Sequence, residues 1–163
     1  MGRKAPQTAR ALSDIYGRLY GRYGPQHWWP GETPFEVVIG AILTQSTAWT
    51  NVEKAIANIK AADVLDPESL HKISTADLGE LIRPSGYYNA KSLKLKAFIE
   101  RLHDIYEGNL DRLFELDTSD LRRELLSIHG IGPETADSIL LYAAYRPIFV
   151  IDAYTKRIMS RLD

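Results

Sequence analysis

Apolar and polar residues recur with a helical period along nearly the whole chain of 163 residues. The clearest helix start is TPFE at residues 33–36, a capping box with proline at the first helical position. The apolar run FEVVIGAIL that follows would also suit a buried strand, and the capping box favours a helix. DPE at residues 66–68 and STAD at residues 74–77 predict two further helix starts.

The second half of the chain continues the same pattern. NAKSLKLKAFIERLHDIY predicts a long helix over residues 89–106, and TSDLRRELLSI predicts another that ends at residues 129–130. Gly132 and Pro133 predict a helix start, and AYTKRIMSRL predicts a last helix after the short extended piece PIFVI. The expected apolar positions of the long helix are Leu93, Leu95, Phe98, Ile99, Leu102 and Ile105, and those of the helix after Pro133 are Ala136, Ile139, Leu140, Ala143 and Ala144. We therefore expect an all-α, multi-helix fold.

Composition limits the class of protein. With 45% apolar and 25% charged residues, the chain can form one globular domain over residues 1–163. We find no run of 18 apolar residues and no apolar signal core, so we expect a cytoplasmic protein without a membrane partner. We also expect it to be a monomer. The absence of cysteine excludes disulfides, thiol catalysis and iron–sulfur ligands within these residues.

The net charge of −1 is unevenly distributed. Basic residues gather in residues 1–22, 89–101 and 146–161, which predicts a local basic face. Separate solvated helix faces are the alternative interpretation. The four histidines lack metal-ligand spacing, so we expect no zinc site; they are His27, His71, His103 and His129.

The stretch SIHGIGPETADSIL places two glycines between two predicted helices. Gly130 and Gly132 can adopt backbone angles closed to other residues, and they leave amide N–H groups near a helix N-terminus free to bind an anion. A DNA phosphate suits that geometry. A plain hairpin between two helices also uses glycine, so the turn alone leaves both interpretations open.

The wider context resembles a known family. LLSIHGIGPETADSILLYA followed by FVIDAYTKRI is similar to the helix-hairpin-helix and Gly/Pro…Asp signature of the endonuclease III superfamily of DNA glycosylases. TPFEVVIGAILTQSTAWTNVEKA and IRPSGYYNAKSLKLKAF extend the resemblance to about residues 10–162. It implies a DNA glycosylase fold with its helix-hairpin-helix at about residues 119–146, and double-stranded DNA with a damaged base as the partner.

The resemblance assigns the chemistry to Asp152. A carboxylate there would stabilise the oxocarbenium-like transition state as the bond between deoxyribose and base breaks. Asp152 also reads as the N-cap of the last helix, and the two roles are compatible. Glu134 occupies the position of the family's Schiff-base lysine, which predicts a monofunctional glycosylase. Lys156, one helical turn after Asp152, remains an alternative amine.

The resemblance also implies a base pocket of Trp28, Trp29, Pro30 and Trp49, as in the 3-methyladenine branch of the superfamily. Indole rings would stack on a flipped, cationic N-alkylated purine, although tryptophan also serves as core packing. Gln45 matches the glutamine that fills the space of the flipped nucleotide, and Tyr87 matches the wedge residue. A loop-facing polar role for Gln45 is the alternative. The DNA-binding set is completed by His129, Gly130, Ile131 and Gly132.

Two other functions remain open at this point. One is a bifunctional glycosylase and lyase of the endonuclease III type for oxidised pyrimidines, against which Glu134 argues. The other is a non-catalytic helix-hairpin-helix module that only binds DNA. The sequence stops at Asp163, directly after a predicted helix, so we expect the domain to lack a C-terminal segment here. Many family members carry a four-cysteine segment after this point. We expect no cofactor in this chain, and a [4Fe-4S] cluster only if the protein has such a C-terminal segment.

Overall fold

The computed structural model describes residues 7–26 and 28–161. His27 therefore lies outside the described residues. The chain divides into two units, Met1–Pro30 and Gly31–Asp163. The first unit contains helix α1 (Gln7–Tyr23), on which the rings of Tyr16 and Tyr20 stack with their centroids 5.7 Å apart. That the chain forms one domain stays a prediction.

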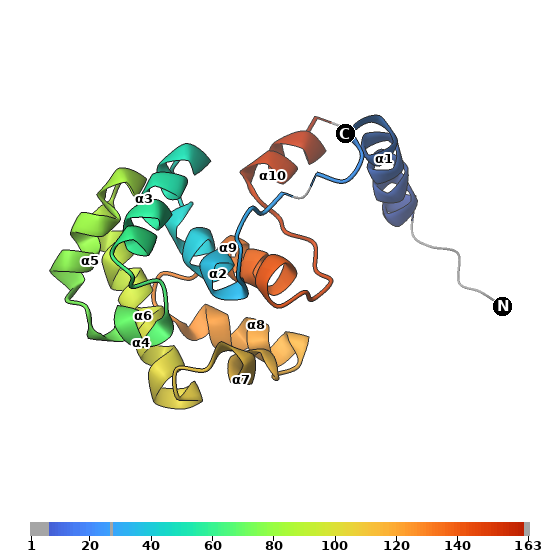
Figure 1. The fold of residues 1–163 in the computed structure, drawn as a ribbon. Helices are drawn as coiled ribbons and strands as arrows, with labels where there is room; N and C mark the ends of the chain where they lie inside the picture. Colours follow the sequence, from blue (N-terminus) through green and yellow to red (C-terminus); the bar gives the residue numbers. More distant parts are fainter. Residues whose placement is uncertain (1–6, 27, 162–163) are drawn as a thin grey trace. The chain divides into compact units, whose positions relative to one another are not determined.

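The second unit is a bundle of helices (Figure 1). In chain order it contains α2 (Pro34–Leu43), α3 (Trp49–Ala61), α4 (Pro67–Lys72), α5 (Thr75–Leu81), the 3₁₀ turn η1 (Arg83–Ser85), α6 (Tyr88–Tyr106), α7 (Leu110–Phe114), α8 (Thr118–Ser127), α9 (Pro133–Ser138), the π-helical turn η2 (Ile139–Ala143) and α10 (Ala153–Met159). The described residues contain no β-strand, so the all-α prediction is confirmed. Among the described helices, none is long and apolar enough to span a bilayer.

The predicted helix starts are confirmed by their capping bonds. The Thr33 hydroxyl accepts a hydrogen bond from the Glu36 amide at 3.1 Å, and Pro34 is the first residue of α2. Asp66 caps α4 by accepting from the Ser69 amide at 2.8 Å. The Ser74 hydroxyl caps α5 in the same way. These side chains satisfy amides that a helix start leaves without a partner, so the caps fix where each helix begins.

Helix α2 forms the centre of this unit. Its residues from Phe35 to Leu43 are all buried, which explains the uninterrupted apolar run in the sequence. Figure 1 shows α3–α6 gathered on one side of α2, and α9 with η2 packs against another part of its surface. The burial of whole apolar side chains supplies most of the stabilisation of such a bundle, at roughly 25 cal/mol per Å².

Helix α6 differs from its prediction in which residues it buries. Leu95, Phe98, Ile99 and Leu102 are buried as expected. Leu93 and Ile105 were predicted apolar positions, but they lie at the surface. The polar residues that this helix buries are Lys91, Ser92 and Lys96. Two lysine side chains of α6 therefore lie in the interior of the bundle.

Helices α8 and α9 form the predicted hairpin. Helix α8 ends at Ser127, two residues before the predicted stop, and α9 begins at Pro133 with Gly132 as its N-cap. The Arg122 guanidinium joins the two helices by donating hydrogen bonds of 2.7 and 3.2 Å to the two oxygens of the buried Asp137 carboxylate. This two-point ion pair fixes the angle between the helices.

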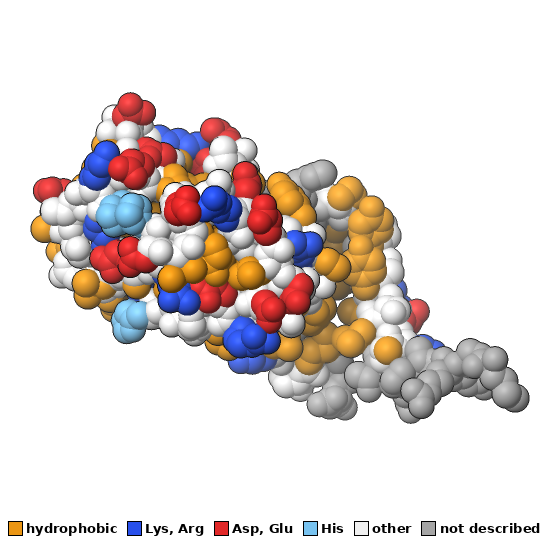
Figure 2. Space-filling model, turned by 90° about the horizontal axis from the view of Figure 1, so that it is seen from below, with side chains coloured by type: hydrophobic (Ala, Val, Ile, Leu, Met, Phe, Trp, Pro, Cys, Tyr) orange, Lys and Arg blue, Asp and Glu red, His pale blue; other side chains and the backbone are white. Residues whose placement is uncertain are grey.

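Acidic and basic side chains are interspersed on the face of the molecule in Figure 2. No continuous basic field covers the described part of that face. The predicted basic face is therefore not this one, and it remains a prediction for other parts of the surface.

Candidate active site and nucleic-acid interface

The two glycines of the hairpin turn have different backbone conformations. Gly130 has φ +84°, in the left-handed region that favours glycine. A Cβ atom at Gly130 would also collide with the side-chain stem of Lys94. Gly132 has φ −92° and ψ 176°, an extended conformation open to any residue, so the expectation of special backbone angles there is wrong. A Cβ atom at Gly132 would meet nothing within 4 Å, so this side of the turn is open to a ligand.

The residue between the glycines supports the turn from inside. The Ile131 side chain is buried, and its amide donates a 3.1 Å hydrogen bond to the Ile128 carbonyl. The Ile131 amide therefore already has a partner. Within this turn, the N–H groups predicted to bind a phosphate are then those of the two glycines. The side chain of His129, just before the turn, is exposed at the surface.

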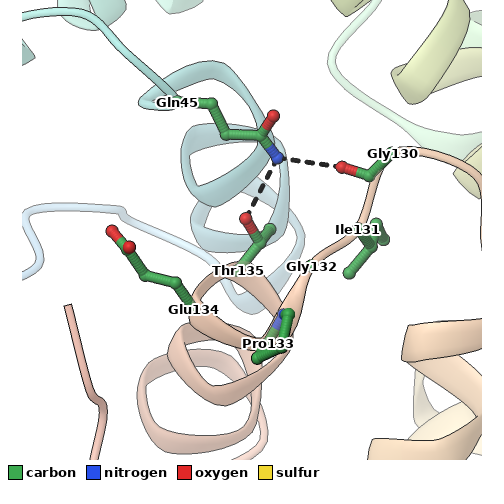
Figure 3. A pocket seen from close by; sticks show the side chains of 7 residues that line it. All are labelled: Gln45, Gly130, Ile131, Gly132, Pro133, Glu134 and Thr135. Carbon is green, nitrogen blue, oxygen red and sulfur yellow. Dashed lines mark hydrogen bonds between the residues drawn. The ribbon is translucent and has the colours of Figure 1, made fainter. Parts of the chain in front are cut away.

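Gln45 lies directly beside this turn (Figure 3). Its side-chain nitrogen donates to the Gly130 carbonyl at 3.1 Å and to the Thr135 hydroxyl at 3.0 Å. Its side-chain oxygen accepts a 2.5 Å hydrogen bond from the Lys94 ammonium. The amide thus connects the loop after α2 with the hairpin through its nitrogen and with α6 through its oxygen. In this structure its polar group is engaged with the protein, so insertion into DNA stays a prediction and would require these bonds to open.

A pocket of about 460 Å³ lies between Gln45 and the hairpin turn. Its other lining residues run from Gly130 to Thr135, so the structure brings five of the predicted site residues together: Gln45, Gly130, Ile131, Gly132 and Glu134. Glu134 is exposed in the first turn of α9, and Figure 3 shows its side chain pointing away from Gly130. The residue that lines the pocket at this position is therefore a glutamate and not a lysine.

A second pocket, of about 240 Å³, connects Gln45 with the predicted wedge residue. It is lined by Gln45, Ser46, Tyr87, Ala90, Lys91 and Lys94. Tyr87 is 76% exposed and has φ 46°, in the left-handed region, immediately before α6. The next residue, Tyr88, packs its ring against the Arg83 guanidinium, whose central carbon lies 4.7 Å from the ring centroid.

Lys91, Lys94 and Thr135 also belong to this site, although no sequence motif predicted a role for them here. Lys91 precedes Leu95, Phe98 and Leu102 at spacings of four, seven and eleven, the phase of a buried helix face. That phase is the signal that would have marked Lys91 as an interior lysine. The contacts of Lys94 and Thr135 with Gln45 join residues far apart in the chain, and no local pattern reports them.

Asp152 is the N-cap of α10, as predicted. Its carboxylate accepts a 2.6 Å hydrogen bond from the Thr155 amide, and the side chain is half-buried. Asp152 lines neither of the two pockets described above. Burial raises the pKa of the Tyr142 phenol, and the negative charge of Asp152 raises it further. Tyr142 is part of η2, and π-helical turns are frequent at functional sites.

The predicted base pocket draws residues from both units of the chain. Trp28, Trp29 and Pro30 belong to the first unit, and Trp49 belongs to the second, where it begins α3 and its indole N–H donates to the Glu53 carboxylate at 2.9 Å. Trp28 is exposed and Trp29 is half-buried. The assembly of these four residues into one pocket stays a prediction. The described residues contain no cluster of histidine, aspartate and glutamate suited to a metal ion.

Comparison with known proteins identifies the family. A family model described as the HhH-GPD superfamily of base excision DNA repair proteins matches residues 39–163. The chain belongs to this superfamily. Among the HhH-GPD relatives is a proposed DNA repair glycosylase of Methanocaldococcus jannaschii, 53% identical over 91% of this chain and 68% of the relative. Endonuclease III of Thermotoga maritima is 32% identical over 79% of this chain and 56% of the relative.

Solved structures of HhH-GPD glycosylases share the fold. The 3-methyladenine DNA glycosylase MagIII of H. pylori, in a crystal structure with 1,N6-ethenoadenine, superposes with a TM-score of 0.80 at 30% identity. The match covers 94% of this chain and 72% of MagIII. An endonuclease III–DNA complex superposes with a TM-score of 0.77 at 23% identity, covering 96% of this chain and 68% of that protein, which establishes likeness of fold alone. The resemblance to the superfamily and to its 3-methyladenine branch is confirmed.

Proposed function

We propose that this HhH-GPD protein is a monofunctional DNA glycosylase that hydrolyses the N-glycosidic bond of N-alkylated purines in duplex DNA. The observation that carries the proposal is the pocket between Gln45 and the hairpin turn, which has Glu134 where a lyase of this family would have lysine. The open surface at Gly132 supports an approach of the DNA backbone to this turn.

Asp152 supplies the carboxylate of the reaction. As the glycosidic bond breaks, positive charge develops on the sugar, and a carboxylate held in place lowers the energy of that transition state. Because Asp152 is the N-cap of α10, its carboxylate is held in place by the 2.6 Å hydrogen bond that it accepts from the Thr155 amide. Water then adds to the sugar, and the free base leaves an abasic site.

Glu134 limits the reaction to base removal. A lyase needs an amine that adds to the sugar C1′ and forms a Schiff base, and a carboxylate has no such chemistry. We therefore assign hydrolysis without strand cleavage to this site. A bifunctional enzyme for oxidised pyrimidines is the second candidate, because the chain is also 32% identical to endonuclease III of Thermotoga maritima.

Two observations support N-alkylated purines as the substrate class. The sequence carries Trp28, Trp29, Pro30 and Trp49 at the pocket positions of the 3-methyladenine branch. The MagIII structure that this chain resembles holds 1,N6-ethenoadenine. Purines alkylated on N3 or N7 are cationic in DNA, and an indole face attracts a desolvated cation by about 1–2 kcal/mol.

The residues of this chain do not fit an iron–sulfur cluster. Such a cluster is held by cysteine thiolates, and the chain has no cysteine. The proposed reaction runs through Asp152 and water, and no step in it uses a metal.

The test is a panel of duplexes that contain 3-methyladenine, 7-methylguanine, uracil or thymine glycol. We expect strand breaks only in the alkylated-purine duplexes, and only after alkali converts the abasic sites into breaks. Sodium borohydride, added during the reaction, should trap no protein–DNA adduct. Cleavage of the thymine glycol duplex without alkali, together with a trapped adduct, would establish the bifunctional enzyme instead. Binding of the duplexes without release of any base would establish the DNA-binding module.

A further inference from the structure

We propose that Lys91 is a positioning residue that fixes the Gln45 loop, residues 44–47, relative to the Tyr87 loop, residues 85–87. The inference rests on the proposed function, because Gln45 and Tyr87 are the residues expected to enter a damaged duplex. The two loops come from distant parts of the sequence, so their spacing depends on a connection between them.

The Lys91 ammonium provides that connection. Its Nζ atom donates to the Leu43 carbonyl at 2.8 Å and to the Ser85 carbonyl at 2.6 Å. Leu43 is the last residue of α2, and the Gln45 loop follows it directly. Ser85 ends η1 and begins the Tyr87 loop. One cation therefore joins the starting points of both loops.

Burial makes this connection specific. Lys91 is 2% exposed, and a buried ammonium is stable only when its N–H groups have acceptors. The last carbonyls of a helix have no partner inside the helix and carry partial negative charge, so they are suitable acceptors. A lysine has three N–H donors on one atom, which lets it bind carbonyls from different elements. If either loop moved away from α6, the ammonium would lose one of its two carbonyl acceptors.

Both loops contain a residue in a strained conformation. Ser46 has φ 55° and Tyr87 has φ 46°, and a residue with a side chain costs about 1–2 kcal/mol in this region. Such conformations persist only where the surroundings hold them. Lys91 lines the same pocket as these two strained residues, so all three belong to one local structure.

The chain contains a matched control in Lys96. This residue is on the same helix, is 8% exposed, and donates to the Leu70 and His71 carbonyls at 2.9 and 2.8 Å. Its acceptors lie in the last turn of α4, away from both loops. Lys91→Met and Lys96→Met therefore remove the same kind of buried contact from two places on α6.

The experiment measures affinity for a duplex with a tetrahydrofuran abasic analogue and for the intact duplex, by fluorescence anisotropy at fixed salt. A 2-aminopurine opposite the analogue reports unstacking of the bases at the gap. We expect Lys91→Met to lower the preference for the abasic duplex about tenfold, which corresponds to about 1.4 kcal/mol, and to lose most of the 2-aminopurine signal. Lys96→Met should lose as much folding stability as Lys91→Met. It should nevertheless keep the preference for the abasic duplex within about twofold and retain the 2-aminopurine signal.

Equal losses of preference in the two variants would overturn the proposal, because Lys91 would then act only on stability. A wild-type protein with no preference for the abasic duplex would instead overturn the proposed function, and this inference with it. If Lys91→Met does not fold, Lys91→Gln keeps N–H donors on a chain too short to reach both carbonyls. It should show the same tenfold loss, and an unchanged preference in that variant would refute the role of Lys91.

Discussion

The side-chain amide of Gln45 donates a 3.1 Å hydrogen bond to the carbonyl oxygen of Gly130, which lies 85 residues further along the chain. This bond connects the loop after the central helix α2 with the turn of the helix-hairpin-helix. Gln45, which is predicted to fill the space of the flipped nucleotide, is therefore bonded directly to the predicted phosphate-binding turn. Movement of one of them changes the contacts of the other.

Replacement of Gln45 tests how strongly the two segments are joined. Gln45→Ala removes the partly buried bonds to Gly130, Thr135 and Lys94, so the free energy of unfolding should fall by about 1–2 kcal/mol. The matched control is Asn51→Ala, which removes a single 3.3 Å bond to Thr47 and should cost less than about 0.5 kcal/mol. Urea unfolding followed by circular dichroism gives both values. Similar small losses in the two variants would show that the Gln45 bonds do not stabilise the turn.

The two glycines of the turn predict opposite results for one substitution. Gly130→Ala places a side chain at φ +84° and against the stem of Lys94, so we expect a loss of about 1–3 kcal/mol in the free energy of unfolding. Gly132→Ala has an allowed backbone and open space, so its stability should change by less than about 0.5 kcal/mol. Gly132→Asp should be equally stable but bind duplex DNA more weakly, because its carboxylate repels phosphate.

Thermal unfolding and anisotropy with an undamaged duplex separate these effects. A Gly132→Asp protein with wild-type affinity at low salt would contradict the role of this turn as a phosphate-binding site. An equally stable Gly130→Ala protein would show that the turn adopts another backbone conformation.

Local signals in the sequence were sufficient to predict most of the helices. Thr33, Asp66 and Ser74 each cap the helix that follows, because an N-cap bond spans only three residues and depends on no distant contact. Asp152 was predicted as a cap for the same reason, and the structure confirms it. Its catalytic role rests on the family resemblance and stays a prediction.

Tertiary contacts explain what the sequence did not predict. Leu93 suited the apolar pattern of α6, yet it is exposed to solvent. Lys91 is buried because carbonyls from α2 and η1 accept hydrogen bonds from its ammonium. Those acceptors are visible only once the chain is folded. The strained φ angle of Tyr87 likewise depends on the elements around it, because tyrosine has no intrinsic preference for the left-handed region.

The buried Lys91 also predicts how stability depends on pH. Burial, with a smaller contribution from the charge of Lys94, lowers the pKa of the Lys91 ammonium from 10.5 to about 8. Between these values the unfolded chain binds the proton and the folded chain does not, so the free energy of unfolding rises with pH. Below pH 8 both states are protonated and this contribution is constant. The gain reaches at most about 3 kcal/mol near pH 10.5, at about 1.4 kcal/mol for each pKa unit.

Tyrosines and other lysines titrate in the same range, so the informative quantity is the difference between wild type and Lys91→Met. Urea unfolding at pH 7.5, 8.5, 9.5 and 10.5 gives this difference. We expect it to shift in favour of the wild type as the pH rises. A difference that is constant with pH would mean that Lys91 titrates alike in the folded and unfolded states.

The central claim is that the Asp152 carboxylate drives base removal, and it is tested most directly by single-turnover excision from a duplex with one N-alkylated purine. The matched control is Asp117→Asn, because Asp117 caps α8 in the same way that Asp152 caps α10. We predict that Asp152→Asn slows excision at least about 100-fold while DNA affinity stays within about threefold, and that Asp117→Asn excises at the wild-type rate. Excision by Asp152→Asn at the wild-type rate would contradict the account.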